Sequence, residues 1–315
     1  MAHQVTTPRI AVLPDGIRPW AAAAVRAGGG EIVQPDQADA LVWTATGFEP
    51  GFQPRDLAAV VKDHPGIRWI QLPWAGVEPY AEAGIFDREH VWTSGKGVYA
   101  RPCAEHALAL SLAGLRHLKD FAQARRWTGQ AGVSLIEGRV TIFGGGGIAE
   151  ELIGLLRPFG CRITVVRKRP APMEGVSRVL EWGARHEALE GAQAVVLALA
   201  LTPETEGAFG ATEFEAMDGG AWLVNVARGR HVRTDDLVEA LRQERIGGAA
   251  LDVTDPEPLP DDHPLWSLPN CLITPHTANT YAMAIPLLSA RISGNVRRFA
   301  TGEPLIGPVD PDLGY

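Results

Sequence analysis

The sequence has little cysteine, no long apolar run and no excess of positive charge, and each absence excludes a class of protein. Its three cysteines, Cys103, Cys161 and Cys271, lie far apart in 315 residues and form no CxxC pair, which argues against a disulfide framework or a cysteine-rich zinc site. The longest apolar run, residues 194–201, is too short to cross a bilayer. A net charge of −8 argues against a general nucleic-acid-binding protein, because phosphate contacts need a basic surface.

Two further patterns are missing. The amino-terminal residues run straight into a strand-like segment at 9–13 without a long apolar region, so no secretory signal is expected. Histidines with metal-ligand spacing are also missing: His186 and Glu187 begin like an HExxH motif, but Glu190 stands where the second histidine would be. We therefore predict a reduced, cytoplasmic protein that holds no metal.

Glycine and proline are abundant, with 35 and 24 residues, which predicts many tight turns. Strand-like and helix-like segments alternate along a chain long enough for two domains, and this pattern indicates an α/β fold with parallel sheets. The expected strands are residues 9–13, 40–44, 67–72, 91–93, 139–143, 162–166, 194–200, 221–225, 248–252 and 271–274. The expected helices are residues 20–27, 57–62, 104–117, 148–158, 212–217, 234–244 and 285–299.

A cluster of four glycines separates one of these strands from the helix after it. Gly144 allows a tight turn, Gly146 lets a pyrophosphate approach the main chain, and the small Ala149 allows helix and strand to pack closely. Gly147 and Ile148 begin the helix, whose free amides attract phosphate. The pattern indicates a dinucleotide-binding site, and the alternative is a glycine-rich surface turn.

The residues after the next strand indicate which dinucleotide is bound. NAD sites usually place Asp or Glu there to bind the ribose 2′-hydroxyl, but this sequence has Arg167, Lys168 and Arg169. Three cations suit a 2′-phosphate, which an arginine can bind through two hydrogen bonds. We predict NADP as the cofactor, with NAD possible; the alternative is a solvated basic loop.

Residues 224–278 resemble the D-isomer-specific 2-hydroxyacid dehydrogenase family. The stretch VNVARGRHVRTDDLVEALRQERIGGAALDV is similar to the family's segment around its arginine, and DPEPLPDDHPLWSLPNCLITPHTAN is similar to the segment with its glutamate and histidine. The segment GVYARPCAEHALAL extends the similarity toward the amino terminus. The resemblance implies an NAD(P)-dependent oxidoreductase that acts on the CH–OH group of a 2-hydroxy acid.

The resemblance also implies three catalytic residues. Arg228 is the substrate-binding arginine, Glu257 the supporting carboxylate and His276 the acid/base. A guanidinium can contact the carboxylate and the carbonyl of a 2-keto acid in one plane. A histidine can give a proton to the forming alkoxide, and a neighbouring carboxylate raises its pKa. Singly, each residue could instead be a loop cation, a solvated turn acid or a polar strand end.

Two more residues of this segment are expected at the cofactor. Ala227 precedes the substrate-binding arginine, and Asp252 ends a strand at the sheet edge where ligands bind. Asp252 competes with Glu257 for the role of supporting carboxylate, but the resemblance gives that role to Glu257. We expect Asp252 to anchor its loop or to contact the nicotinamide end of the cofactor.

The first domain is expected to complete the substrate site. Trp74, Ala75 and Gly76 resemble the family loop whose backbone amides hold the substrate carboxylate, since successive N–H groups can form a site for an anion. Trp74 is expected to line the pocket, although a tryptophan that packs the loop onto the core is an equal alternative.

The resemblance predicts two Rossmann-like domains with a cleft between them. A discontinuous, flavodoxin-like substrate-binding domain would comprise residues 1–101 and 283–315, and a dinucleotide-binding domain residues 102–282. The family further implies a homodimer, with residues 104–117 and the arm through Trp127 in the interface. The predicted reaction reduces glyoxylate or hydroxypyruvate to a D-2-hydroxy acid. The alternatives are an NAD-dependent enzyme of the phosphoglycerate dehydrogenase type, a dinucleotide-sensing corepressor or scaffold, and a degenerate, inactive paralogue.

Overall fold

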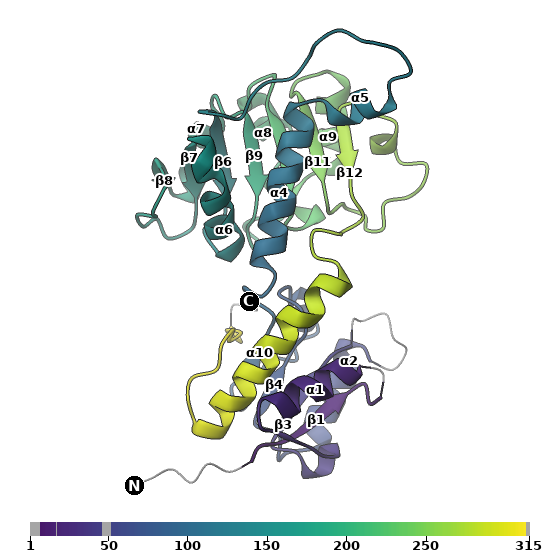
Figure 1. Cartoon of the computed structure of the whole chain (residues 1–315), viewed down its shortest axis with the longest axis vertical. Coiled ribbons are helices and arrows are strands. Elements are labelled where there is room, and N and C mark those ends of the chain that lie inside the picture. The colour runs from purple at the N-terminus through teal and green to yellow at the C-terminus, as the bar shows by residue number, and fades with distance from the viewer. Residues whose placement is uncertain (1–6, 17, 46–51, 313–315) are drawn as a thin grey trace. The chain divides into compact units, whose positions relative to one another are not determined.

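The chain divides into two compact units in a computed structural model that describes residues 7–16, 18–45 and 52–312 (Figure 1). The first unit comprises Met1–Tyr99 and Thr280–Tyr315, and the second comprises Ala100–Asn279. The sequence predicted domain boundaries at residues 101 and 282. The assignment of substrate to the first unit and dinucleotide to the second stays a prediction.

The first unit contains a five-stranded parallel sheet in the order β2-β1-β3-β4-β5. This is the strand order of flavodoxin-like folds. Its strands are β1 (Arg9–Leu13), β2 (Glu31–Ile32), β3 (Ala40–Trp43), β4 (Trp69–Gln71) and β5 (Val91–Thr93). Its helices are α1 (Pro19–Ala27), α2 (Pro54–Asp63), α3 (Glu78–Glu82) and α10 (Tyr281–Thr301).

Helix α10 joins the first unit although it comes from the end of the chain. Its buried residues Ile292 and Val296 belong to one apolar cluster with Ile10 and Trp69 of the sheet. A buried polar contact adds to this packing, because the side-chain amide of Asn295 donates to Gln71 Oε1 at 2.9 Å. Since buried polar groups need partners, this bond fixes α10 against the end of β4.

The second unit contains a seven-stranded parallel sheet in the order β12-β11-β10-β9-β6-β7-β8. Counted from β6, the first six strands follow the 3-2-1-4-5-6 order of dinucleotide-binding folds. The strands are β6 (Arg139–Phe143), β7 (Arg162–Val166), β8 (Arg178–Leu180), β9 (Ala194–Leu197), β10 (Trp222–Asn225), β11 (Gly248–Leu251) and β12 (Cys271–Ile273). The prediction of an α/β fold with two parallel sheets is confirmed.

Helices cover both faces of the second sheet, as its continuously apolar strands require. Helices α4 (Ala100–Leu115) and α6 (Gly147–Leu156) pack on one face, and α4 crosses the front of the sheet in Figure 1. Helices α7 (Arg185–Leu189), α8 (Ala211–Ala216) and α9 (Thr234–Arg242) pack on the other. Adjacent residues of β9 illustrate the division, because Val196 faces the first group and Val195 the second.

The structure corrects several predicted bounds. Helix α4 begins at Ala100 rather than 104, because Pro102 fits in the first turn, where its missing N–H has no helical partner to lose. The sequence missed β2, β8, α3, α7 and α5 (Leu118–Gln123), which are too short to show a clear period. In the part of the chain that the structure describes, no helix is long and apolar enough to cross a membrane.

Candidate active site

The glycine turn lies between β6 and α6. Gly144 has a φ of 111°, and a Cβ there would lie 2.2 Å from the carbonyl oxygen of Ala198, so a side chain cannot be placed. Gly146 precedes α6, and no atom of the described residues lies within 4 Å of a Cβ built there. Ala149 is fully buried between α6 and the sheet. The main chain at Gly146 is therefore open to a ligand.

The first turn of α6 provides the donors for an anion. Gly147 and Ile148 begin this ten-residue helix, and the first backbone N–H groups of a helix have no intrahelical acceptor. The acids that follow, Glu150 and Glu151, are both exposed, and Glu151 lies 3.8 Å from Arg101. The backbone amides at Gly147 and Ile148 therefore fit the pyrophosphate of a dinucleotide.

The basic residues after β7 lie next to this turn. A Cβ on Gly145 would lie 2.9 Å from the Cδ and Nε of Arg167, so this side chain lies against the glycine turn. Lys168 is exposed and forms an ion pair with Glu204 at 3.1 Å. Arg169 is exposed, and neither it nor Arg167 is paired with a carboxylate among the described residues. Arg167 is therefore the best placed of the three cations to meet a 2′-phosphate.

His276 and Glu257 form the ion pair that the resemblance implies. Nδ1 of His276 lies 2.6 Å from Oε1 of Glu257, and both side chains are partly exposed. The hydrogen bond to Glu257 raises the pKa of His276, while burial and the charge of Arg228 oppose this effect. Because the carboxylate occupies Nδ1, the other ring nitrogen, Nε2, is left for a substrate.

Asp252 anchors the loop that carries His276. Its carboxylate accepts hydrogen bonds from the Thr274 hydroxyl at 2.6 Å and from the backbone amides of Thr277 and Ala278 at 2.8 and 2.9 Å. Burial acts to raise the pKa of Asp252, but these bonds and one from His106 outweigh it and lower the pKa to about 2. The carboxylate is therefore ionised at neutral pH; its contact with the nicotinamide stays a prediction.

Arg228 follows β10, and its backbone is held by the buried side chain of Asn225. The Asn225 Nδ2 donates to the carbonyl of Arg228 at 2.8 Å, and its Oδ1 accepts from the amide of Ala227 at 3.0 Å. The Arg228 Nη1 also donates to the carbonyl of Ala227 at 2.7 Å. Asn225 thus holds the backbone at Arg228, and the carbonyl of Ala227 holds the guanidinium.

The turn after Arg228 packs directly on the segment that leads to Glu257. A Cβ on Gly229 would lie only 1.9 Å from the carbonyl oxygen of Thr254. Glycine at this position is what lets the arginine turn and the glutamate loop approach each other. Arg228, Glu257 and His276 therefore come together at the carboxyl edge of the second sheet, where open α/β sheets bind ligands.

Gly229→Ala is expected to lower the free energy of unfolding by more than about 2 kcal/mol, because the added methyl overlaps backbone rather than a mobile side chain. Gly154→Ala is the matched control, since a Cβ at that exposed helical position meets no described atom. It should be neutral or stabilising by up to about 1 kcal/mol. Urea unfolding of both variants checks this; equal stability would show that the two loops do not pack this tightly.

In the first unit, Trp74, Ala75 and Gly76 lie between β4 and α3. The Tyr99 hydroxyl donates to the carbonyl of Pro73 at 2.6 Å, and the rings of Trp74 and Tyr99 are 6.1 Å apart. Tyr99 therefore holds this loop through a hydrogen bond and a ring contact. Trp74 is half-buried and lines a small apolar cavity, so part of its surface packs against the first unit. The substrate contacts of these three residues stay a prediction.

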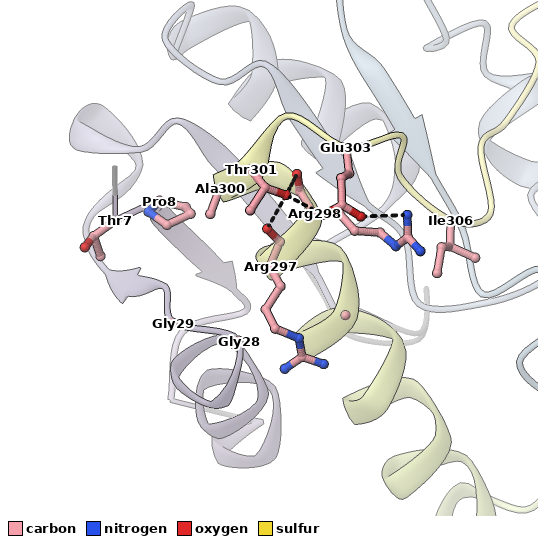
Figure 2. Close-up of a pocket in the computed structure, with 11 residues that line it drawn as sticks. Thr7, Pro8, Gly28, Gly29, Arg297, Arg298, Ala300, Thr301, Glu303 and Ile306 are labelled. Atoms are coloured by element: carbon pink, nitrogen blue, oxygen red, sulfur yellow. Dashed lines mark hydrogen bonds and ion pairs between the residues drawn. The ribbon is translucent and has the colours of Figure 1, made fainter. Parts of the chain in front are cut away.

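A second cavity of about 620 Å³ in the first unit is not part of this site (Figure 2). It lies beside Pro8, which precedes β1, so it is at the amino edge of the parallel sheet, opposite the edge that carries Trp74. Its cations have partners: Arg298 lies 3.4 Å from Glu303, and Arg297 donates to Ser293 at 2.8 Å. They belong to the packing of α10 and are not assigned to a ligand.

The sequence missed three residues of the site: Asn225, Thr274 and His106. Asn225 ends an apolar strand, and such a polar strand end was a usable signal. The other two meet only in the fold, where His106 Nε2 lies 3.0 Å from the Thr274 hydroxyl although 168 positions separate them. In the described part of the chain, no group of three or more His, Cys, Asp or Glu side chains could hold a metal ion.

Comparisons with known proteins show what this chain is similar to. Residues 106–278 match the family described as D-isomer specific 2-hydroxyacid dehydrogenase, NAD binding domain. An uncharacterized protein encoded in the proB 3′ region of Corynebacterium melassecola is 35% identical over 299 residues, 93% of this chain and 95% of the relative. The human glyoxylate reductase/hydroxypyruvate reductase is 34% identical over 211 residues, which are 64% of each chain.

A solved structure also matches nearly the whole chain. The D-isomer specific 2-hydroxyacid dehydrogenase of Xanthobacter autotrophicus Py2, in complex with NADPH and MES, has a TM-score of 0.85 and 26% identity. The match covers 98% of this chain and 100% of that one. The cofactor prediction agrees with the NADPH in that complex.

The chain therefore belongs to the D-isomer-specific 2-hydroxyacid dehydrogenase family. It is an NAD(P)-dependent oxidoreductase that acts on the CH–OH group of small 2-hydroxy acids, as the resemblance implied. The roles of its individual residues, its substrate and its assembly are proposals.

Proposed function

We propose that this enzyme reduces glyoxylate to glycolate or hydroxypyruvate to D-glycerate and prefers NADPH. The observation that carries the proposal is the His276–Glu257 pair, with its Nδ1–Oε1 distance of 2.6 Å, next to the turn that carries Arg228. The name of the human relative supports the choice of substrates. Both substrates are small and carry a carboxylate beside a carbonyl.

In this proposal each residue has one task. Arg228 binds the carboxylate and the carbonyl oxygen of the keto acid and so orients the carbon that is reduced. His276 donates a proton from Nε2 to the carbonyl oxygen as it becomes a hydroxyl, and Glu257 stabilises the protonated ring. The amides of residues 74–76 hold the substrate carboxylate. NADPH, when bound, supplies the hydride.

The dinucleotide would be held by the second unit. The start of α6, with Gly146, Gly147 and Ile148, would bind the pyrophosphate. Gly144 makes the tight turn that directs the first turn of this helix toward it. Ala227 and Asp252 lie at the same sheet edge and are expected near the nicotinamide. Residues 167–169 meet the 2′-phosphate, with Arg167 as the principal contact because of its position against Gly145.

Arg167→Asp should shift the cofactor preference from NADPH toward NADH, because a carboxylate repels a 2′-phosphate and can bind a ribose 2′-hydroxyl. We expect the ratio of kcat/KM for NADPH to that for NADH to fall about 100-fold. Arg178→Asp is the control, since this exposed cation pairs with Glu187 instead. If this ratio were the same in Arg167→Asp and the wild type, Arg167 would not contact the 2′-phosphate of the cofactor.

We also propose that the enzyme is a homodimer. The segment after α4 exposes three large apolar side chains within ten residues: Leu118, Phe121 and Trp127, the last with its whole surface exposed. Such groups are commonly buried by a partner. Sedimentation analysis of the wild type should give a dimer, and a monomer would contradict the proposal.

A substrate panel tests the proposed function. Purified enzyme is mixed with NADPH or NADH and, separately, with glyoxylate, hydroxypyruvate, pyruvate and longer 2-keto acids, while the absorbance of the reduced nicotinamide is followed. We expect the fastest loss of absorbance with NADPH and the two smallest polar keto acids. Faster turnover of long apolar keto acids would overturn the substrate assignment, and no turnover despite dinucleotide binding would favour a sensing role.

A further inference from the structure

We propose that His106, on helix α4, is a positioning residue of the active site: through Thr274 and Asp252 it holds the loop that carries His276 in its working conformation. The proposal rests on the acid/base role proposed for His276. It adds a residue from a different element, which the motifs around the arginine and the histidine do not contain.

The loop is wrapped around Asp252. The backbone amide of His276 donates to the carbonyl of Asp252 at 2.8 Å, while the amides of Thr277 and Ala278 donate to its carboxylate. His276 itself has a φ of 49°, a left-handed conformation that a residue with a Cβ adopts only when its surroundings enforce it. The position of the catalytic ring therefore depends on how firmly Asp252 is held.

His106 holds Asp252 from the side of α4. Its Nε2 lies 3.0 Å from the Thr274 hydroxyl oxygen and 3.3 Å from Asp252 Oδ1. The Thr274 hydroxyl donates to the same carboxylate oxygen at 2.6 Å, so it can accept a hydrogen bond from the ring. The Nε2–H of His106 thus completes a hydrogen-bonded group of His106, Thr274 and Asp252. Asp252 is buried, with 2% of its surface exposed.

The neighbours of His106 on α4 show that this contact is unusual for the helix. Ala104, Ala107 and Leu110 pack on the sheet as apolar residues, and an apolar side chain at 106 would extend the same kind of surface. Burial raises the pKa of the thiol of Cys103, one turn earlier, to about 11; the charge of Asp252 adds to this effect and that of Arg228 opposes it. The thiol is neutral, so the polar link from this turn of α4 is made by His106.

Two substitutions separate the hydrogen bond from the packing. His106→Leu removes the donor but keeps a side chain suited to a helix, whereas His106→Gln keeps an N–H near the Nε2 position. His117→Gln is the control, because this half-buried histidine contacts Asp120 and Trp222 beyond the end of α4. Thr274→Val removes the intermediate hydroxyl and serves as the second variant if His106→Leu does not fold.

The first readout is the pKa of the His276 ring, measured by NMR titration of histidine-labelled protein. In the wild type the bond to Glu257 raises this pKa; if the loop loosens in His106→Leu, that bond weakens and the pKa falls toward the ordinary value. His106→Gln and His117→Gln should retain the wild-type pKa. This readout needs no turnover, so it tests the positioning role even if the proposed function fails.

The second readout is the kinetics of keto-acid reduction. We expect kcat of His106→Leu to fall about ten- to a hundredfold, as for a displaced catalytic group, with the KM for NADPH unchanged and with most of the loss restored in His106→Gln. An unchanged His276 pKa together with an unchanged kcat in folded His106→Leu or Thr274→Val would overturn the proposal. A wild type without turnover on any keto acid would instead refute the proposed function alone.

Discussion

His276→Ala is expected to lower kcat by about 10³-fold, because the substrate oxygen must then take its proton from water. The affinity for NADPH should change little, since the glycine turn and Arg167 are untouched. Stopped-flow measurement of a single turnover gives the chemical step directly. His263→Ala is a suitable control, because the side chain of this histidine has one described hydrogen bond, which it accepts from the nearby amide of Leu265.

A graded variant makes this prediction sharper. In the proposed reaction His276 must carry a proton in the direction of reduction, and its raised pKa keeps it protonated to higher pH. Activity is therefore retained below this pKa and lost as the pH rises through it. Glu257→Gln removes the charge that raises the pKa, so the falling limb of the kcat profile should move to lower pH. If kcat fell at the same pH in Glu257→Gln and in the wild type, Glu257 would not be the group that raises the pKa of the titrating residue.

Arg228→Ala is expected to lower kcat/KM for the keto acid by about 10³-fold. A guanidinium that makes two charge-assisted hydrogen bonds to one substrate contributes roughly 3–6 kcal/mol, and each 1.4 kcal/mol is a factor of ten. Arg228→Lys should recover only part of the loss, because an ammonium group cannot make the planar two-bond contact. Steady-state kinetics with saturating NADPH provide the comparison.

Arg230→Ala is the matched control for this experiment. It removes a guanidinium two positions along the chain, where an exposed ion pair with Glu206 at 2.8 Å contributes no more than about 1 kcal/mol. Its kcat/KM should remain within about threefold of the wild type. If Arg230→Ala and Arg228→Ala lost activity equally, Arg228 would have no special place at the substrate.

The parts of the site that lie close together in the sequence were predictable from it. Gly144 and Gly146 follow a strand and precede a helix, and that local order already defines the turn. The α/β class followed from the alternation of strands and helices, because each buried strand needs a helix to cover it. The edges of the elements were less predictable; α4, for example, begins before Pro102 because a first-turn proline loses no hydrogen bond.

The contacts that fix the side chains proposed to be catalytic were not predictable, because they join distant segments. Asn225 holds the backbone of Arg228 through its side-chain amide, and Gly229 touches the carbonyl of Thr254. No pattern of apolar residues specifies such bonds, which depend on the exact register of neighbouring strands. His106 is the extreme case, since 168 positions separate it from Thr274 in the sequence.

The most direct test of the account is the stereochemistry of the product formed from hydroxypyruvate and NADPH. The enzyme should consume one NADPH for each glycerate formed, and chiral analysis should show the D isomer alone. Formation of the L isomer, or no glycerate from protein that demonstrably binds NADPH, would contradict the proposed reaction.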